Sequence, residues 1–154
     1  MPQLDSKYFG KLEFSPDAVF QFRCGIPAYE DQAAFVFLQQ PQANPLVFMQ
    51  SLSDPDLCFI TVPVSVADPV YRLELGPEDL TALGLSHDRA PVIGSDVLCL
   101  ALVTVTEDSD PTVNLAAPIV LNLKNQQGIQ GIQTPSGYSY RRLLPGQEAL
   151  VTCS

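Results

Sequence analysis

Residues 112–122, TVNLAAPIVLN, set two strand-like pieces around Pro118, with Asn114 and Asn122 flanking them. Just upstream, residues 97–105, VLCLALVTV, form the longest apolar run of the chain and are rich in β-branched side chains. Short apolar runs bounded by turn residues are typical of β-strands rather than helices. A membrane-spanning helix needs about 20 apolar residues, so these stretches predict strands of a folded core and no membrane segment.

Strand-like patterns continue towards the N-terminus. Five stretches are either short apolar runs or alternate in period two: residues 8–14, 33–38, 46–51, 57–62 and 70–75. Proline cannot donate to a strand ladder and belongs at strand starts, edges or bulges. Most of the 14 prolines stand at boundaries of these runs. Pro63 interrupts ITVPVSV, so the strand before it is expected to end or bend there.

One short helix is expected over residues 76–84, GPEDLTALG. Pro77 suits the first turn, Glu78 and Asp79 favour the positive end of the helix dipole, and Gly84 suits a C-terminal stop. About ten short strands with one or two small helices predict an all-β fold, a small barrel-like antiparallel domain. The chain has 154 residues and no Pro/Gly/Ser-rich linker, so a single domain over residues 1–154 is expected.

The negative charge of the chain is concentrated in one segment. Eleven acids and two bases lie between residues 54 and 110, so this segment carries the whole formal net charge of −9. A nucleic-acid-binding protein should instead show a basic patch, and direct contact with nucleic acid is therefore not expected. The acids either keep the protein dispersed in water or form a negative face that attracts a basic partner.

Residues that could carry chemistry are few, and no catalytic residue, metal site or cofactor is expected. His87 is the only histidine, and no C-x-x-C pair supports a zinc or redox site. Cys58 and Cys99 sit in apolar runs and are expected to be buried thiols, whereas Cys24 precedes a glycine at a turn and is expected to be more exposed.

Two features of the sequence leave room for an enzyme-like function. The run 107–110, EDSD, resembles the start of a calcium loop but lacks the glycine and glutamate that complete one. Any two of the seventeen acids might still converge in space. A small hydrolase or carbohydrate-active domain on a β scaffold therefore remains the alternative function.

Residues 112–122 strongly resemble T-x-N-L-x-A-P-I-V-x-N, the signature of the bacterial flagellar assembly factor FliW. Other segments agree in order: GIPAYE at residues 25–30 is similar to the family's G-I-P-G-[FY]-E turn, and NPLVFMQS at residues 44–51 to its P-x-x-x-[LM]-Q-S segment. Tyr138 and Arg141 fit the family's closing strand. The resemblance spans about residues 8–144.

Two residues depart from the family's pattern. Ala28 stands where glycine is usual, and Ala116 stands where lysine is common. Neither change should break the fold, but Ala116 would alter a contact if its position faces a partner.

The resemblance implies a regulatory role without catalysis. FliW-like proteins bind flagellin and also CsrA, a small RNA-binding translational regulator, and flagellin releases the regulator by occupying FliW. The expected partners are therefore flagellin and a CsrA-type protein, with no direct nucleic acid and no membrane. The first 14 residues lack the apolar segment of a secretory signal, which favours a cytoplasmic location.

Specific side chains are candidates for these contacts. A regulator that binds RNA must present a basic surface, and five acids in turns next to strands are expected to face it: Asp54, Asp56, Glu107, Asp108 and Asp110. Asn114 has two possible roles. It either satisfies backbone groups where the strand breaks before Pro118, or it contacts a partner.

Overall fold

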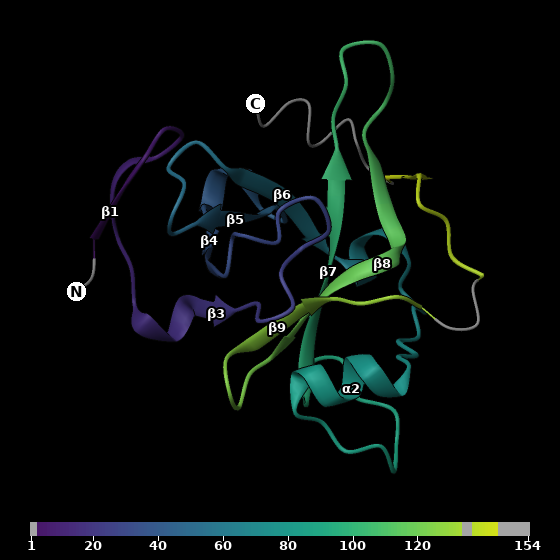
Figure 1. Ribbon diagram of the computed structural model, residues 1–154. Helices are drawn as coiled ribbons and strands as arrows, with labels where there is room; N and C mark the ends of the chain where they lie inside the picture. Colours follow the sequence, from purple (N-terminus) through teal and green to yellow (C-terminus); the bar gives the residue numbers. More distant parts are fainter. Residues whose placement is uncertain (1–2, 134–136, 145–154) are drawn as a thin grey trace.

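Seven strands close into a barrel in the computed structural model, which describes residues 3–133 and 137–144 (Figure 1). Around the barrel the order is β8–β7–β6–β5–β4–β3–β9, and β9 pairs back onto β8. The barrel strands are β3 (Val19–Gln21), β4 (Ala34–Gln39), β5 (Val47–Ser51), β6 (Cys58–Pro63), β7 (Val97–Thr104), β8 (Thr112–Asn122) and β9 (Gln127–Gln130).

The remaining elements decorate this barrel. They are the hairpin β1 (Gln3–Ser6) and β2 (Gly10–Glu13), the edge strand β10 (Arg142–Leu143), the α-helices α1 (Val64–Ala67) and α2 (Pro77–Leu83), and the 3₁₀ turns η1 (Pro16–Ala18) and η2 (Pro41–Ala43). Nearly all strand pairs are antiparallel, and β3 and β9 meet in parallel at Gln21 and Gln127. The predicted all-β, barrel-like fold is confirmed. In the described part of the chain, every helix is too short to cross a bilayer.

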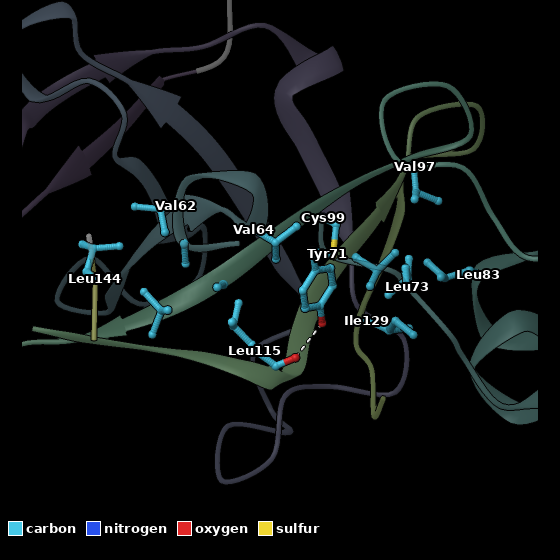
Figure 2. Close-up of a cluster of buried hydrophobic side chains, with 14 residues drawn as sticks. Val62, Val64, Tyr71, Leu73, Leu83, Val97, Cys99, Leu115, Ile129 and Leu144 are labelled. Carbon is cyan, nitrogen blue, oxygen red and sulfur yellow. Dashed lines mark hydrogen bonds between the residues drawn. The ribbon is translucent and has the colours of Figure 1, made fainter. Parts of the chain in front are cut away.

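Strand β8 is the longest, and it closes the barrel by bending. Its first part pairs with β7 and β10, and its second part pairs with β7 and β9. The register against β7 shifts between the pairs Leu102–Asn114 and Leu100–Ile119, so residues 115–118 face a single residue of β7. A bulge of this kind bends a strand and increases its twist. Figure 2 shows β8 turning sharply beside Leu115.

Asn114 holds the inside of this bend. Its Oδ1 atom accepts hydrogen bonds from the backbone N–H of Ala116, at 3.1 Å, and of Ala117, at 3.0 Å. These two N–H groups lie in the bulged segment, where β7 offers no ladder partner. The next residue, Pro118, has no N–H to satisfy. The Asn114 side chain therefore replaces hydrogen bonds that the bend would otherwise lose from the strand ladder.

Other polar groups of the bend find partners in segments before and after β8. The Tyr71 hydroxyl donates to the Leu115 carbonyl oxygen at 2.5 Å, and the Leu115 N–H donates to the Ser139 carbonyl oxygen at 2.9 Å. The Gly131 N–H donates to the Pro118 carbonyl oxygen at 2.8 Å. Figure 2 shows the Tyr71 ring reaching the bend from within a packed apolar cluster. Buried backbone groups are costly when unpaired, so these contacts make the bend possible.

Two apolar cores share the barrel wall. Successive side chains of a strand point to opposite faces, and in β7 Leu100 packs into one cluster while Cys99 and Ala101 pack into the other. The first core fills the barrel interior and is rich in phenylalanine, including Phe22 and Phe35. The second lies outside the wall and contains Val64, Tyr71, Leu73, Leu83, Val97, Val120 and Leu144 among others (Figure 2). A strand buried on both faces explains the continuous apolar run at 97–105.

Residues 70–75 were expected to form a strand, and that prediction is wrong. The alternating burial is real, since Tyr71 and Leu73 are buried while Arg72 and Glu74 are exposed. The backbone, however, bonds mainly to side chains, and within the segment only Leu75 forms a bridge, an isolated one with Gln133. The Gln133 amide accepts from the Glu74 N–H at 2.7 Å and donates to the Arg72 carbonyl at 2.6 Å. The period-two pattern reflects burial of one side of this segment. Such burial does not require the segment to pair with another strand.

The other local predictions agree better with the structure. Helix α2 begins after Gly76 and ends at Gly84, whose φ of 73° is left-handed, as expected. Strand β6 ends at Pro63, where α1 begins. The alternation over residues 8–14 proves to belong to the turn and second strand of the β1–β2 hairpin.

The turn at residues 26–29 explains why an alanine at position 28, where the family usually has glycine, strains the backbone. The Tyr29 N–H donates to the Ile26 carbonyl oxygen at 2.7 Å, Pro27 follows Ile26, and Ala28 has a φ of +72°. These are the features of a type II turn, whose third position favours glycine. A side chain at positive φ is strained.

We expect Asn114→Ala to lower the free energy of unfolding by about 1–3 kcal/mol, because two N–H groups lose their acceptor. Asn114→Asp retains an acceptor oxygen and should stay close to the native value. Chemical denaturation of both variants measures the difference. If Asn114→Ala unfolds at the native midpoint, the side chain does not support the bend.

We expect Ala28→Gly to raise the free energy of unfolding by roughly 0.5–1 kcal/mol, since relief of left-handed strain exceeds the added chain entropy. The matched control is Ala33→Gly, where φ is not positive and the same substitution should destabilise. Thermal melts of the two variants should therefore shift in opposite directions. A fall in melting temperature for Ala28→Gly would contradict the turn assignment.

Candidate functional site

The turn between β5 and β6 carries two of the candidate acids. Asp56 is exposed and Asp54 is half-buried, and the Asp54 carboxylate accepts the Asp56 N–H at 3.0 Å. Beneath them lies Gln50, whose side chain is fully buried. Its amide nitrogen lies 3.0–3.4 Å from four carbonyl oxygens of the turn, those of Ser51, Asp54, Pro55 and Leu57. One amide thus fixes the backbone that presents the two acids.

The β1–β2 hairpin supports the same turn from outside. The Lys7 N–H donates to the Pro55 carbonyl oxygen at 3.0 Å, and the Tyr8 hydroxyl donates to the Asp56 carbonyl oxygen at 3.1 Å. The Lys7 ammonium lies 5.7 Å from the centre of the Tyr8 ring. Lys7 therefore brings a positive charge to the hairpin that supports this turn.

The loop between β7 and β8 carries the other three candidate acids. Glu107, Asp108 and Asp110 are all exposed. Figure 1 shows the β7–β8 hairpin extending well beyond the rest of the barrel, with this loop at its tip. We call the hairpin beyond residue 102 the arm. Within the described residues, the single ion pair joins Arg89 and Asp96 elsewhere, so the three carboxylates at the tip of the arm have no ion-pair partner in that part of the chain.

The two acidic turns lie at the same end of the barrel. Strands β6 and β7 are antiparallel neighbours, with Thr61 opposite Leu102, so β6 begins at the end where β7 finishes. Their recorded pairing covers only Thr61–Pro63, and the two hairpins then diverge (Figure 1). The fold brings the acids to one end on two neighbouring hairpins rather than into one continuous cluster.

The neutral candidate, Asn114, and the family departure Ala116 both turn inward. Asn114 is half-buried and its oxygen is engaged by two backbone N–H groups. Ala116 is only 5% exposed, so its side chain is not available to face a partner. These contacts favour the structural role of Asn114 over the binding role.

The opposite end of the barrel carries an apolar groove of about 460 Å³ that sequence patterns did not reveal. Phe20, Leu100 and Leu121 form part of its floor and are buried. Leu98 and Leu123 are 41% and 43% exposed at its rim. The only hint in the sequence was that residues 97–105 are apolar on both faces, but nothing indicated that Leu98 stands where the barrel opens.

Among the described residues, the histidine and cysteine side chains are His87, Cys24, Cys58 and Cys99. His87 is exposed and bonds to the Thr81 hydroxyl at 3.0 Å. Burial raises the pKa of the Cys58 thiol to about 11 and that of the Cys99 thiol to about 12, which leaves both thiols protonated and weakly nucleophilic at neutral pH. Cys99 is buried, Cys58 is half-buried and Cys24 is exposed, close to the sequence expectation.

Two hollows in the described part of the chain each have a single lining carboxylate, whereas the alternative function would require two. The apolar groove has one lining carboxylate, that of Asp17. A second hollow of about 390 Å³ is lined by Asp96, which is bonded to Arg89 at 2.7 Å. The Arg89 hydrogen bond lowers the pKa of Asp96 to about 2. In the portion of the chain that the structure describes, no group of three histidine, cysteine or acidic residues could hold a metal ion.

Comparison with known proteins places this barrel in a family. Residues 3–144 match the model of the "FliW protein" family. The chain is 36% identical over 149 residues to the flagellar assembly factor FliW of Desulfitobacterium hafniense, covering 96% of this chain and 94% of that one. It is 31% identical over 137 residues to the Syntrophomonas wolfei FliW, covering 88% and 84%.

A solved structure agrees with the sequence matches. The crystal structure of a flagellar assembly factor FliW superposes with a TM-score of 0.78 at 30% identity, covering 94% of this chain and 98% of that chain. The signature at residues 112–122 forms the bent strand that closes the barrel. Sequence, fold and signature therefore agree that the chain belongs to the FliW family of flagellar assembly factors.

Proposed function

We propose that this protein is a cytoplasmic partner switch, a single domain that binds flagellin and antagonises a CsrA-type translational regulator. The family membership supports a role in flagellar assembly. The observation that carries the regulator half of the proposal is the arm, because it projects three exposed carboxylates away from the barrel (Figure 1). A regulator that binds RNA phosphates is basic on its binding face, so it would find a complementary surface there.

Electrostatics favours the arm over the β5–β6 turn as the main contact. Glu107, Asp108 and Asp110 are exposed, and the described residues offer them no ion pair. Asp54 and Asp56 instead have Lys7 in the supporting hairpin. Exposed charges contribute mainly to steering and to the rate of association. Steering weakens as salt rises, since the Debye length is about 8 Å at physiological ionic strength.

Two bindings by one protein must be coupled if flagellin is to release the regulator. Coupling requires either a shared surface or a conformational change that both partners bias. The acidic turns occupy one end of the barrel, and the apolar groove lies at the other. This arrangement favours separate docking sites.

The test of the arm is a charge reversal, Asp108→Lys with Asp110→Lys. We expect binding of the CsrA-type regulator to weaken by about tenfold or more at low salt, because two attractive charges become repulsive, and the salt dependence of the dissociation constant to shrink. Isothermal titration calorimetry at several salt concentrations provides both quantities. Flagellin binding should stay within about twofold of native.

The matched control is Glu74→Lys with Asp88→Lys, two exposed acids away from the arm that change the net charge by the same amount. If both double variants weaken the regulator equally, only net charge matters and the arm is not a contact. If the native protein binds neither flagellin nor the regulator, the proposed function itself is wrong.

A further inference from the structure

The apolar groove continues the interior of the barrel, because inward-facing residues of the barrel strands form much of its lining. In an antiparallel barrel, alternate residues face inward, and the inward series of β7 and β8 continues past the packed core. Leu100 and Leu121 are 5% and 1% exposed, whereas Leu98 and Leu123, the next residues of the same series, are 41% and 43% exposed. The core therefore reaches the surface at this end without a covering element in the described chain.

The groove also has a defined boundary. Strands β3 and β4 contribute Phe20 and Phe37, whose rings meet edge to face with centroids 5.6 Å apart. Ile93, from the loop before β7, is 36% exposed and stands on the rim. The one carboxylate that lines the groove belongs to Asp17, which is exposed. Exposed apolar grooves are typical of sites where ligands or other proteins bind.

We propose that this groove is the docking site for flagellin, and that it receives an apolar segment which the flagellin subunit later buries against its neighbours in the filament. The inference rests on the proposed function, in which flagellin is a partner. Permanent interfaces between subunits are more apolar than transient ones. A subunit that has not yet assembled therefore exposes apolar surface, and an apolar groove is its complement.

Charge on the rim refines the chemistry of the occupant. The Asp17 carboxylate lies beside the groove, and among the groove-lining residues Asp17 is the one charged side chain. A partner segment with large apolar side chains next to a lysine or arginine would fill the groove and pair with this acid. The strongly basic surface of an RNA-binding regulator fits the opposite, acidic end better. The two partners thereby differ in chemistry as well as in docking site.

The experiment compares Leu98→Glu with Ile132→Glu, which places the same charge at a residue 64% exposed outside the groove. Leu98 is partly exposed, so the fold should survive, and thermal melts verify this. We expect Leu98→Glu to weaken flagellin binding by about tenfold or more, since burial of a leucine is lost and a charge is placed in an apolar site. Ile132→Glu should bind flagellin within about twofold of native, and both variants should retain regulator binding.

A fluorescent apolar probe provides a second readout. Anilinonaphthalene sulfonate binds exposed hydrophobic surface and should fluoresce with the native protein, less so with Leu98→Glu, and should be displaced by flagellin. Two results would show that the groove is not the flagellin site while the proposed function stands. Either Leu98→Glu binds flagellin as tightly as the native protein does, or flagellin binds the native protein without displacing the probe. Displacement by a fatty acid but not by flagellin would identify a small-molecule site and overturn the proposal. If native protein does not bind flagellin, both proposals fail.

Discussion

The architecture depends on one constraint, that β8 must bend without leaving backbone groups unpaired. The bent strand pairs with β7 on both sides of residues 115–118, and on its other edge it pairs first with β10 and then with β9. The bend removes four residues from the ladder. Asn114, Tyr71 and backbone groups of residues 131 and 139 supply the missing partners. Barrel closure, and with it the separation of the two cores, follows from those few hydrogen bonds.

The wall formed by β7 and β8 explains how so small a chain supports two apolar cores. Each strand of the wall presents alternate side chains to the barrel interior and to the layer that contains Tyr71 and Leu83. Long polar side chains are accordingly few in the wall. The consequence for function is geometric, because the hydrophobic interior opens at one end and the hairpin that carries the acids extends from the other (Figure 1).

Sequence patterns predicted the strands, the short helix and the fold class well, because these depend on local periodicity and turn chemistry. They mispredicted residues 70–75, where Gln133 and Tyr138 replace a strand partner from more than 50 positions away. Such contacts leave no local pattern. The same limit applies to the candidate site. The acids were evident in the sequence, but their placement at one end, and the opening of the barrel at Leu98, emerge only when distant strands are paired.

The closed order of strands limits how other chains can pair with this protein. An exposed strand edge is a template on which other chains can pair and aggregate. Because β9 returns to β8, none of the seven barrel strands lies at an outer edge of the sheet. In the described chain, the strands with a neighbour on one side only are the two-residue β10 and the four-residue strands of the β1–β2 hairpin. Short open stretches also remain where β6 and β7 diverge beyond their three paired residues. A closed barrel of this kind therefore limits the length of backbone edge on which another chain could add as a strand.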